Sequence, residues 1–266
     1  MSISQFISSS TVRILCDTSD GESVGTGFWF LFEFSGEMKI PVIVTNKHVV
    51  EGAININLCC NVSCSAKPKL KLLDVKMTGG GGIIYHPDPE IDLCIIPMAE
   101  LIEQLRENET ELENFFFQEH NLLNENIITQ TEDVYMTGYP NGLWDSVNNR
   151  PITRKGITAS SPIEDWKGNP EFMIDMACYG GSSGSPVYVM NEGPHTRQGG
   201  IFTGDRLILL GILYAGPTIN ANGCLEVVSV PTSTTAVVST KMMMNLGIVI
   251  KAEKLNDFKP LLGITP

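Results

Sequence analysis

The chain has 266 residues, 42% of them hydrophobic and 18% charged, so it is long enough to bury one large core or two of about 100 to 130 residues each. Acidic residues outnumber basic residues by 30 to 18, and the formal net charge is -12. Phosphate binding needs concentrated positive charge, so a nucleic-acid partner is not expected. An anionic membrane surface would repel the chain, so a membrane partner is not expected either.

The N-terminal segment has no basic region followed by an apolar run, so it predicts no signal peptide. The seven cysteines form an odd, irregular set, which is typical of a reducing compartment. We therefore expect a cytoplasmic protein. Cys59, Cys60 and Cys64 raise the question of zinc, but no histidine or second cysteine pair completes a four-ligand spacing, so no metal or other cofactor is expected.

Runs of β-branched and aromatic residues predict strands in both halves of the chain. In the first half, 24–34 and 39–45 predict a hairpin, and further strands are expected at 54–58, 70–75 and 93–97. In the second half, strands are expected at 133–137, 157–159, 171–176, 186–190, 207–213 and 246–251, followed by a short C-terminal helix. The glycine run 79–82 lacks the Lys-Ser/Thr pair of a phosphate-binding loop, so it predicts a turn.

The pattern changes between residues 99 and 126, where closely spaced Glu, Gln and Leu predict a helix. The sequence thus divides into an N-terminal β unit over 1–105, a helical or loop linker over 106–130 and a C-terminal β unit over 131–266.

One short stretch, YGGSSGSPVYV, places seven consecutive small or cyclic residues before an apolar strand. A serine that attacks a carbonyl carbon needs a base, an acid that orients the base, and backbone N–H donors for the oxyanion. Ser183 lies within this stretch, His48 ends the apolar segment PVIVTNKHVV, and Asp92 opens the apolar strand DLCII. All three lie where a strand meets a turn, so they are candidates for these roles.

Each candidate also fits a purely structural role in forming or closing a turn, because turns often contain serine and aspartate. His86 and Asp88 are weaker alternatives for the base and the acid, since both lie in the turn that precedes Asp92. An α/β-hydrolase is disfavoured, because its histidine follows the serine and its nucleophile precedes a helix. Here the histidine comes first and a strand follows the serine.

Six segments in this order, GTGFWF, TNKHVV, DLCII, MTGYPNG, GSSGSPV and LLGILYAG, resemble the trypsin-like (chymotrypsin-fold) serine peptidases. The resemblance is closest to the bacterial glutamyl endopeptidases and HtrA-type proteases, and it runs from about residue 24 to the C-terminal helix. It implies an all-β fold of two antiparallel six-stranded barrels with the active site between them, a helical linker and a short C-terminal helix. It also implies a serine endopeptidase that cleaves protein or peptide substrates through an acyl-enzyme.

Matched position by position, the resemblance makes Ser183 the nucleophile, His48 the general base and Asp92 the residue that orients His48. The backbone N–H groups of Gly181 and Ser183 would form the oxyanion hole. Glycine at 181 would give the backbone room to turn where a Cβ would obstruct it.

The same resemblance predicts a pocket for the side chain before the scissile bond. Its expected walls offer no carboxylate for a basic side chain and no histidine for an acidic one, so we expect an uncharged, mainly apolar preference. The adjacent edge would pair with the substrate backbone as an added strand. The predicted pocket residues are Ala177, Cys178, Leu213 and Ala215, and the predicted edge is Tyr214, Ala215 and Gly216.

Two features in which this chain differs from the family bear on regulation. Animal trypsins have an acidic residue immediately before the nucleophile, whereas this chain has Ser182, so activation by an N-terminal ion pair is not expected. The 217–244 insertion is long enough to be a lid, a docking hairpin or an autoinhibitory loop. An inactive peptide-binding module of the same fold and a structural or assembly protein remain alternatives, and the sequence carries no signal for oligomeric state.

Overall fold

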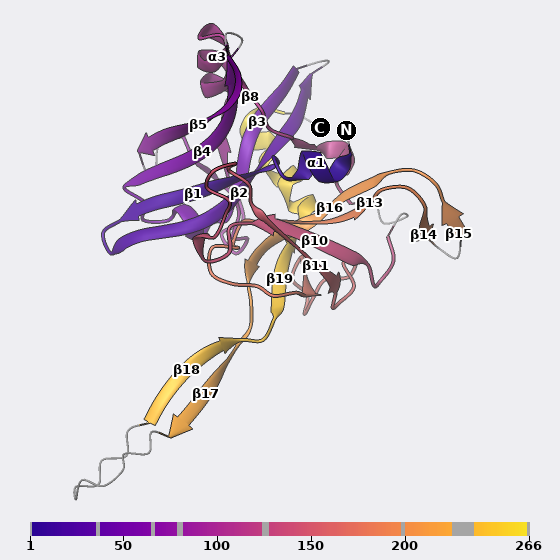
Figure 1. The fold of residues 1–266 in the computed structure, drawn as a ribbon. Helices are drawn as coiled ribbons and strands as arrows, with labels where there is room; N and C mark the ends of the chain where they lie inside the picture. Colours follow the sequence, from indigo (N-terminus) through magenta and orange to yellow (C-terminus); the bar gives the residue numbers. More distant parts are fainter. Residues whose placement is uncertain are drawn as a thin grey trace, which may run out of the picture.

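The computed structural model describes residues 2–35, 38–64, 67–78, 82–123, 128–197, 200–224 and 237–264. Two β units lie side by side, one from each half of the chain (Figure 1). This confirms the predicted all-β class.

The first unit is a nine-stranded sheet. Its path runs β5-β4-β1-β2-β3-β7-β6, with β8 paired to β4 and β9 to β2. Within the described residues this path does not close on itself, so the six-stranded closed barrel expected for this half is replaced by a larger open sheet. The elements are α1 (Ile3–Ile7), β1 (Thr11–Thr18), β2 (Gly21–Ser35), β3 (Met38–Thr45), α2 (Lys47–Val50), β4 (Asn55–Cys64), β5 (Lys67–Thr78), β6 (Ile84–Tyr85), β7 (Cys94–Pro97), α3 (Ala99–Glu107), β8 (Thr110–Leu112), β9 (Phe117–Gln118) and η1 (Glu119–Asn121).

The second unit is a closed six-stranded barrel in the order β10-β11-β12-β19-β16-β13, as predicted. Two additional hairpins leave it, β14–β15 and β17–β18. The elements are β10 (Asp133–Gly138), η3 (Pro140–Gly142), β11 (Ile152–Thr158), β12 (Glu171–Asp175), β13 (Pro186–Asn191), β14 (His195–Arg197), β15 (Gly200–Phe202), β16 (Arg206–Ala215), β17 (Thr218–Cys224), β18 (Val237–Met243), β19 (Leu246–Lys251), and the 3₁₀ helices η4 (Ala252–Phe258) and η5 (Pro260–Leu262).

Strand β2 explains why the first unit is so apolar in the middle. Side chains on a strand point alternately to opposite faces. Phe28 and Phe30 belong to the core shared with the second unit, whereas Trp29 belongs to the separate core of the first unit. All three are fully buried. The continuous apolar run therefore reflects a strand that is covered on both faces.

The prediction of a helix over 99–126 is wrong beyond Glu107, where α3 ends. Glu109 has a positive φ of 52°, which is a common way to terminate a helix. The chain then becomes extended, because Phe117 is fully buried and Phe116 packs edge-on against Trp29. Burial of these aromatic rings outweighs the helical preference of the surrounding glutamates.

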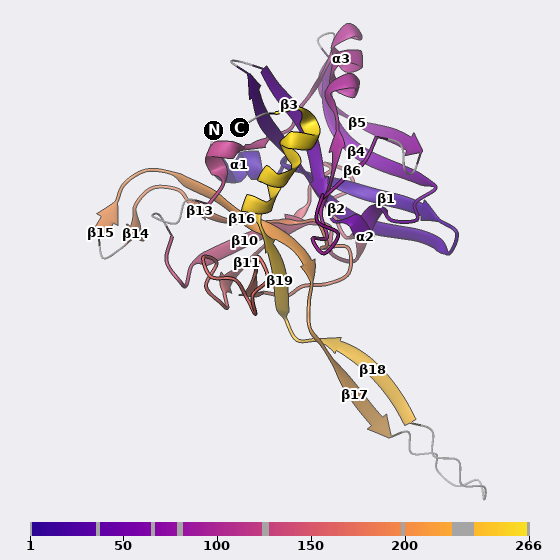
Figure 2. The same ribbon diagram turned by 180° about the vertical axis from the view of Figure 1, so that it is seen from behind.

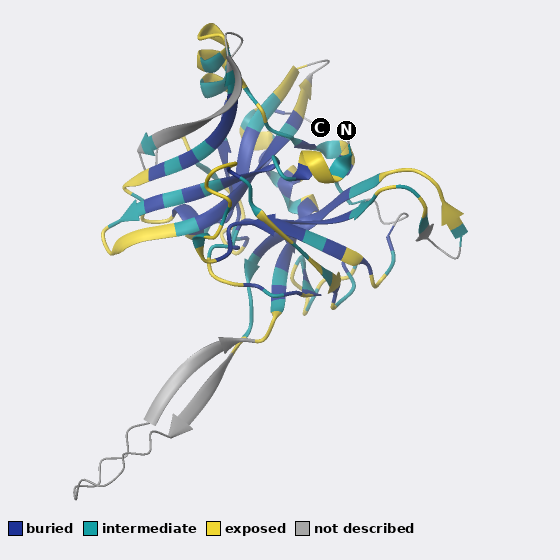
Figure 3. Cartoon of the chain, in the orientation of Figure 1, coloured by how far each residue is buried: buried dark blue, intermediate teal, exposed yellow. Residues whose placement is uncertain are grey.

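Burial is concentrated in the strands of the two units (Figure 3). The β17–β18 hairpin, whose two strands lie within the 217–244 insertion, extends away from both units in two opposite views (Figures 1 and 2). Residues 79–81 of the predicted glycine turn and 225–236 of the insertion lie outside the described part. None of the described helices is long and apolar enough to cross a membrane.

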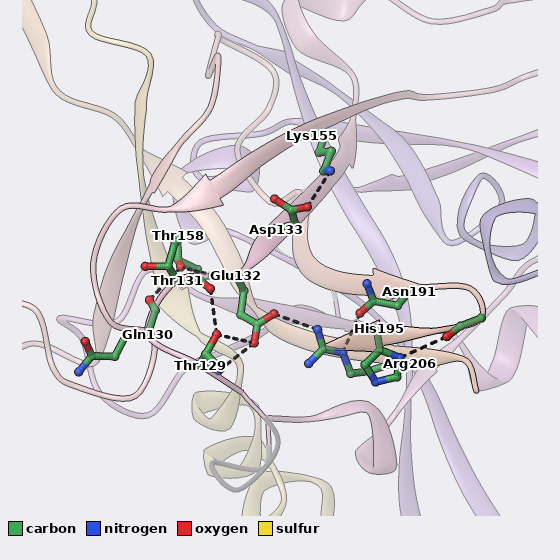
Figure 4. A network of polar contacts seen from close by, with 11 residues as sticks. Thr129, Gln130, Thr131, Glu132, Asp133, Lys155, Thr158, Asn191, His195 and Arg206 are labelled. Carbon is green, nitrogen blue, oxygen red and sulfur yellow. Dashed lines mark hydrogen bonds and ion pairs between the residues drawn. The ribbon is translucent and has the colours of Figure 1, made fainter. Parts of the chain in front are cut away.

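A polar network joins the residue before β10 to strands β13 and β16 of the second barrel (Figure 4). Arg206 donates to Glu132 and to Asn191 at 2.9 and 2.8 Å. Glu132 also accepts the backbone N–H of Thr129 at 2.8 Å. The carboxylate is nearly buried, and these several donors compensate its loss of water.

Candidate active site

Neighbouring strand ends bring His48 and Asp92 together. Strands β3 and β7 are paired through Thr45 and Cys94. His48 follows β3 on the one-turn helix α2, and Asp92 lies just before β7. Asn46 anchors this junction by donating its side-chain amide to the Asp92 carbonyl at 2.8 Å.

Asp92 contacts His48 through both carboxylate oxygens. Oδ2 lies 2.5 Å from His48 Nδ1, and Oδ1 accepts the backbone N–H of His48 at 3.1 Å. The carboxylate therefore places the proton on Nδ1 and fixes the ring plane. The His48 side chain is 44% exposed, and its contact with Asp92 uses Nδ1, not the other ring nitrogen, Nε2.

The loop that carries Ser183 packs against β2. The Ser183 carbonyl accepts the backbone N–H of Thr26 at 2.9 Å, and Thr26 is joined to the His48 strand because its carbonyl accepts from Thr45 Oγ1 at 2.7 Å. The Ser183 hydroxyl donates to the Tyr214 carbonyl at 3.5 Å. Within the described chain no hydrogen bond joins Ser183 to His48, so the serine lies beside the histidine strand with its hydroxyl turned toward β16.

Gly181 adopts a conformation that requires glycine. Its φ is +80°, and a Cβ there would lie 2.5 Å from the Tyr139 carbonyl. The preceding carbonyl, of Gly180, accepts the Asn141 N–H at 2.6 Å. Because a trans peptide points its C=O and N–H in opposite directions, the N–H of Gly181 is directed away from Asn141. Neither this N–H nor that of Ser183 has a hydrogen-bond acceptor among the described residues.

The predicted pocket residues differ in accessibility. Cys178 and Leu213 are only 2% and 3% exposed and belong to the core of the second barrel. Ala177, Tyr214, Ala215 and Gly216 are partly buried. The partly accessible surface at this position is therefore formed by these four residues.

An arginine that the sequence did not predict lies against this region. Arg154 donates from its guanidinium to the Ala177 carbonyl, and its guanidinium carbon lies 4.9 Å from the centre of the Tyr179 ring. No sequence signal identifies it, because Arg154 comes from strand β11, distant in sequence from Ala177 and Tyr179.

Burial affects two ionisable groups near the serine. It raises the pKa of the Cys178 thiol to about 11, although Arg154 counteracts the effect. The thiol is therefore protonated at neutral pH and is a poor nucleophile. The pKa of Tyr214 is also raised, first by burial, then by its hydrogen bond to Glu171 and by the charges of Glu171 and Asp92.

The other histidines with described contacts occupy structural positions. His86 is buried, accepts the Asp88 N–H on Nδ1 at 3.1 Å, and lies 3.2 Å from Asp257 through Nε2. His195 stacks on Phe202 in the β14–β15 hairpin. No group of three or more His, Cys, Asp or Glu side chains in the described residues is arranged to hold a metal ion.

Comparison with known proteins bears on these observations. A model of the trypsin-like peptidase domain matches residues 25–193, more than half of the chain, and this stretch contains His48, Asp92 and Ser183. No curated protein matches the chain.

Several solved structures are similar at low sequence identity. The HtrA-type protease AlgW with a tripeptide is 16% identical with a TM-score of 0.49, covering 98% of this chain and 63% of that chain. A serine endoprotease from Yersinia pestis is 15% identical with a TM-score of 0.49, covering 97% and 64%. Tobacco etch virus protease with its product is 14% identical with a TM-score of 0.47, covering 79% and 69%. The chain spans less than two thirds of the first two proteins. On the match over residues 25–193, the chain belongs to the trypsin-like peptidase domain family.

Proposed function

We propose that this chain cleaves protein or peptide substrates with Ser183 as the nucleophile, His48 as the general base and Asp92 as the residue that orients His48. The observation that carries the proposal is the double contact of Asp92 with the ring and the backbone of His48. This contact leaves Nε2 as the ring atom that accepts the serine proton.

The reaction proceeds in two stages. Ser183 Oγ bonds to the carbonyl carbon of the substrate while His48 Nε2 takes the hydroxyl proton. His48 then donates that proton to the departing amine, which leaves an ester on Ser183. Water attacks the ester, His48 takes a proton from the water, and the acid product leaves as Ser183 regains its proton.

The N–H groups of Gly181 and Ser183 stabilise the negative oxygen of the tetrahedral intermediate. Their lack of acceptors among the described residues supports this role, because such donors must be free before the charge develops. The Ser183 hydroxyl must rotate from Tyr214 to reach His48. Its hydrogen bond to Tyr214 is 3.5 Å long, so losing it costs little.

We propose an uncharged, mainly apolar side chain before the scissile bond. The side chain of Ala177 carries no charge to attract a basic or an acidic group, and the nearby Arg154 guanidinium already contacts the Ala177 carbonyl and the Tyr179 ring. Leu213, buried in the barrel core, gives an apolar backing to the same region.

Peptide-library digestion followed by mass spectrometry tests this function. We expect the wild type to cleave mainly after uncharged apolar residues and Ser183→Ala to cleave nothing. Equal cleavage by Ser183→Ala would contradict the proposed nucleophile. Cleavage mainly after Lys or Arg, or mainly after Glu or Asp, would contradict the proposed pocket.

An inactive peptide-binding module is the second candidate. The observation that favours it is the orientation of the Ser183 hydroxyl toward Tyr214. This alternative requires that the folded wild type binds library peptides without cleaving them.

We also propose a cytoplasmic location, without a nucleic-acid or membrane partner. The odd set of cysteines and the net charge of -12 support it. Fractionation of cells that produce the chain with an epitope tag tests the location, and recovery from the medium or the membrane pellet would contradict it.

A further inference from the structure

Thr26 connects three segments that are far apart in the sequence. It lies in β2 and is completely buried. Its Oγ1 donates to the Gly181 carbonyl at 2.8 Å and accepts the N–H of Tyr139 at 3.1 Å. Its backbone N–H donates to the Ser183 carbonyl at 2.9 Å. One residue of the first unit thus holds the nucleophile loop and the segment after β10, both in the second unit.

These contacts lie on both sides of Ser182. The side chain of Thr26 holds the carbonyl before Ser182, and its backbone holds the carbonyl after it. Ser182 is buried, and its hydroxyl has no hydrogen-bond partner among the described residues. The nucleophile loop is therefore attached to the first unit through these two carbonyls, without help from the Ser182 side chain.

The hydroxyl of Thr26 matters because Gly181 has few constraints of its own. Glycine populates several backbone conformations at similar energy. The Gly180 carbonyl is held by Asn141, and the Gly181 carbonyl is held by Thr26. The Gly181 N–H shares its planar peptide with the Gly180 carbonyl, and the Gly181 carbonyl belongs to the following peptide. With one peptide held by Asn141 and the next by Thr26, the φ and ψ angles of Gly181 are restricted, and the N–H keeps its direction.

The nucleophile loop packs so closely against Thr26 that only glycine fits at position 184. A Cβ at Gly184 would lie 1.9 Å from the Thr26 carbonyl oxygen. The absence of a side chain at 184 therefore permits the loop to approach β2 closely enough for the hydroxyl of Thr26 to reach Gly181.

We propose that Thr26 is a positioning residue for the oxyanion hole, holding the Gly181 N–H in the direction that the developing oxyanion requires. This inference rests on the proposed function, in which Ser183 is the nucleophile and Gly181 a donor. It assigns to a side chain of the first unit control over the oxyanion site of the second. The attachment is uncharged, in a chain that has Ser182 where an acidic residue would provide an ion pair.

The test compares Thr26→Val, which removes the hydroxyl and keeps the branched shape, with Thr26→Ser, which keeps the hydroxyl. For Thr26→Val we expect kcat to fall on the order of 10- to 100-fold, because small displacements of catalytic donors have effects of this size. The KM should change by less than about twofold, because the hydroxyl does not contact substrate. Thr26→Ser should retain most of the wild-type kcat.

A matched control exists in the second barrel. Thr158 is also a buried threonine whose Oγ1 donates to a carbonyl, that of Gln130, at 3.1 Å. It likewise accepts a backbone N–H, that of Glu132, at 2.9 Å (Figure 4). Thr158→Val should lower thermal stability as Thr26→Val does, without lowering kcat.

Binding of a peptide aldehyde provides a second measurement, because its adduct with serine carries the negative oxygen. We expect Thr26→Val to weaken aldehyde binding by about the same factor as kcat falls. If Thr26→Val does not fold, Thr26→Cys replaces it, since a thiol is a weak donor. Its kcat should then lie about tenfold below that of Thr26→Ser.

The outcomes separate the two proposals. A wild type that cleaves peptides, together with an equally active Thr26→Val, would overturn the positioning role and leave the proposed function intact. Equal losses in Thr26→Val and Thr26→Ser, or in Thr26→Val and Thr158→Val, would also overturn it. A folded wild type that neither cleaves peptides nor reacts with a fluorophosphonate would overturn the proposed function, and the role of Thr26 with it.

Discussion

Asp92 acts on His48 through two atoms, and a single amide replacement tests this geometry. In Asp92→Asn the carboxylate that accepts the Nδ1 proton is lost, so the ring is free to take the wrong tautomer. We expect kcat to fall on the order of 10³- to 10⁴-fold, with little change in folding. Steady-state kinetics, with Asp88→Asn as the control, measures the effect. A similar loss in both variants would contradict the assignment.

Cys178 links burial to alkaline stability. Burial raises the pKa of its thiol from 9.0 to about 11, so the folded chain keeps a proton that the unfolded chain loses near pH 9. The resulting stability is complete below about pH 9 and declines as the pH rises through about 11. Urea unfolding between pH 8 and 11 should show a smaller alkaline decline for Cys178→Ala than for the wild type. Parallel declines would contradict this contribution.

The sequence predicts some individual residues better than others. Ser183, His48 and Asp92 lie in local segments with recognisable order, and the need for glycine at 181 follows from backbone crowding. Thr26 and Arg154 could not be assigned roles, because each acts on a carbonyl more than 20 residues away. Contacts of this kind have no local pattern.

Strands were predictable where the apolar pattern was strong. Strand β2 and strand β16 both lie where the sequence indicates. The end of the helix in the linker was not predictable from the sequence. The helix ends at Glu107, and the burial of Phe117 and the packing of Phe116 on Trp29 hold the following residues in an extended conformation. Strand β1 was missed because its eight residues mix polar with apolar side chains and contain no continuous apolar run.

The β17–β18 hairpin is the element whose removal should matter least to the chemistry. Its two strands pair with each other and form a sheet separate from the barrel. Replacing 219–242 by a short Gly-Ser turn should change kcat/KM for short peptides by less than about twofold. Thermal unfolding should shift by roughly 3 °C or less. A large loss of short-peptide cleavage would indicate a lid, and a large gain would indicate autoinhibition; either would contradict the expectation.

At the scale of the whole molecule, the two units share one core. Phe28 and Phe30 of the first unit and Tyr188, Leu209 and Ile250 of the second belong to the same buried cluster. The relative position of His48 and Ser183, one in each unit, therefore depends on this packing as well as on the contacts of Thr26.

His86 connects the Asp92 loop to the C-terminal 3₁₀ helix. Its Nδ1 accepts from Asp88, which leaves the Nε2 proton facing Asp257 and the Lys254 carbonyl. Removing the buried ring in His86→Ala takes away the acceptor of the Asp88 N–H and the donor that faces the Lys254 carbonyl, whereas Asp257 keeps its ion pair with Lys254. We therefore expect a loss of about 1–3 kcal/mol in the free energy of unfolding. Denaturant unfolding measures it, with His195→Ala as the control. Equal stability of the two variants would contradict a connecting role for His86.

The central claim, an assembled serine-hydrolase site, is tested most directly by intact-mass analysis after fluorophosphonate labelling of the wild type and Ser183→Ala. The reagent reacts only when nucleophile, base and oxyanion donors act together. We predict a single adduct on the wild type and none on Ser183→Ala. A folded wild type without an adduct, or an adduct that persists on Ser183→Ala, would contradict the account.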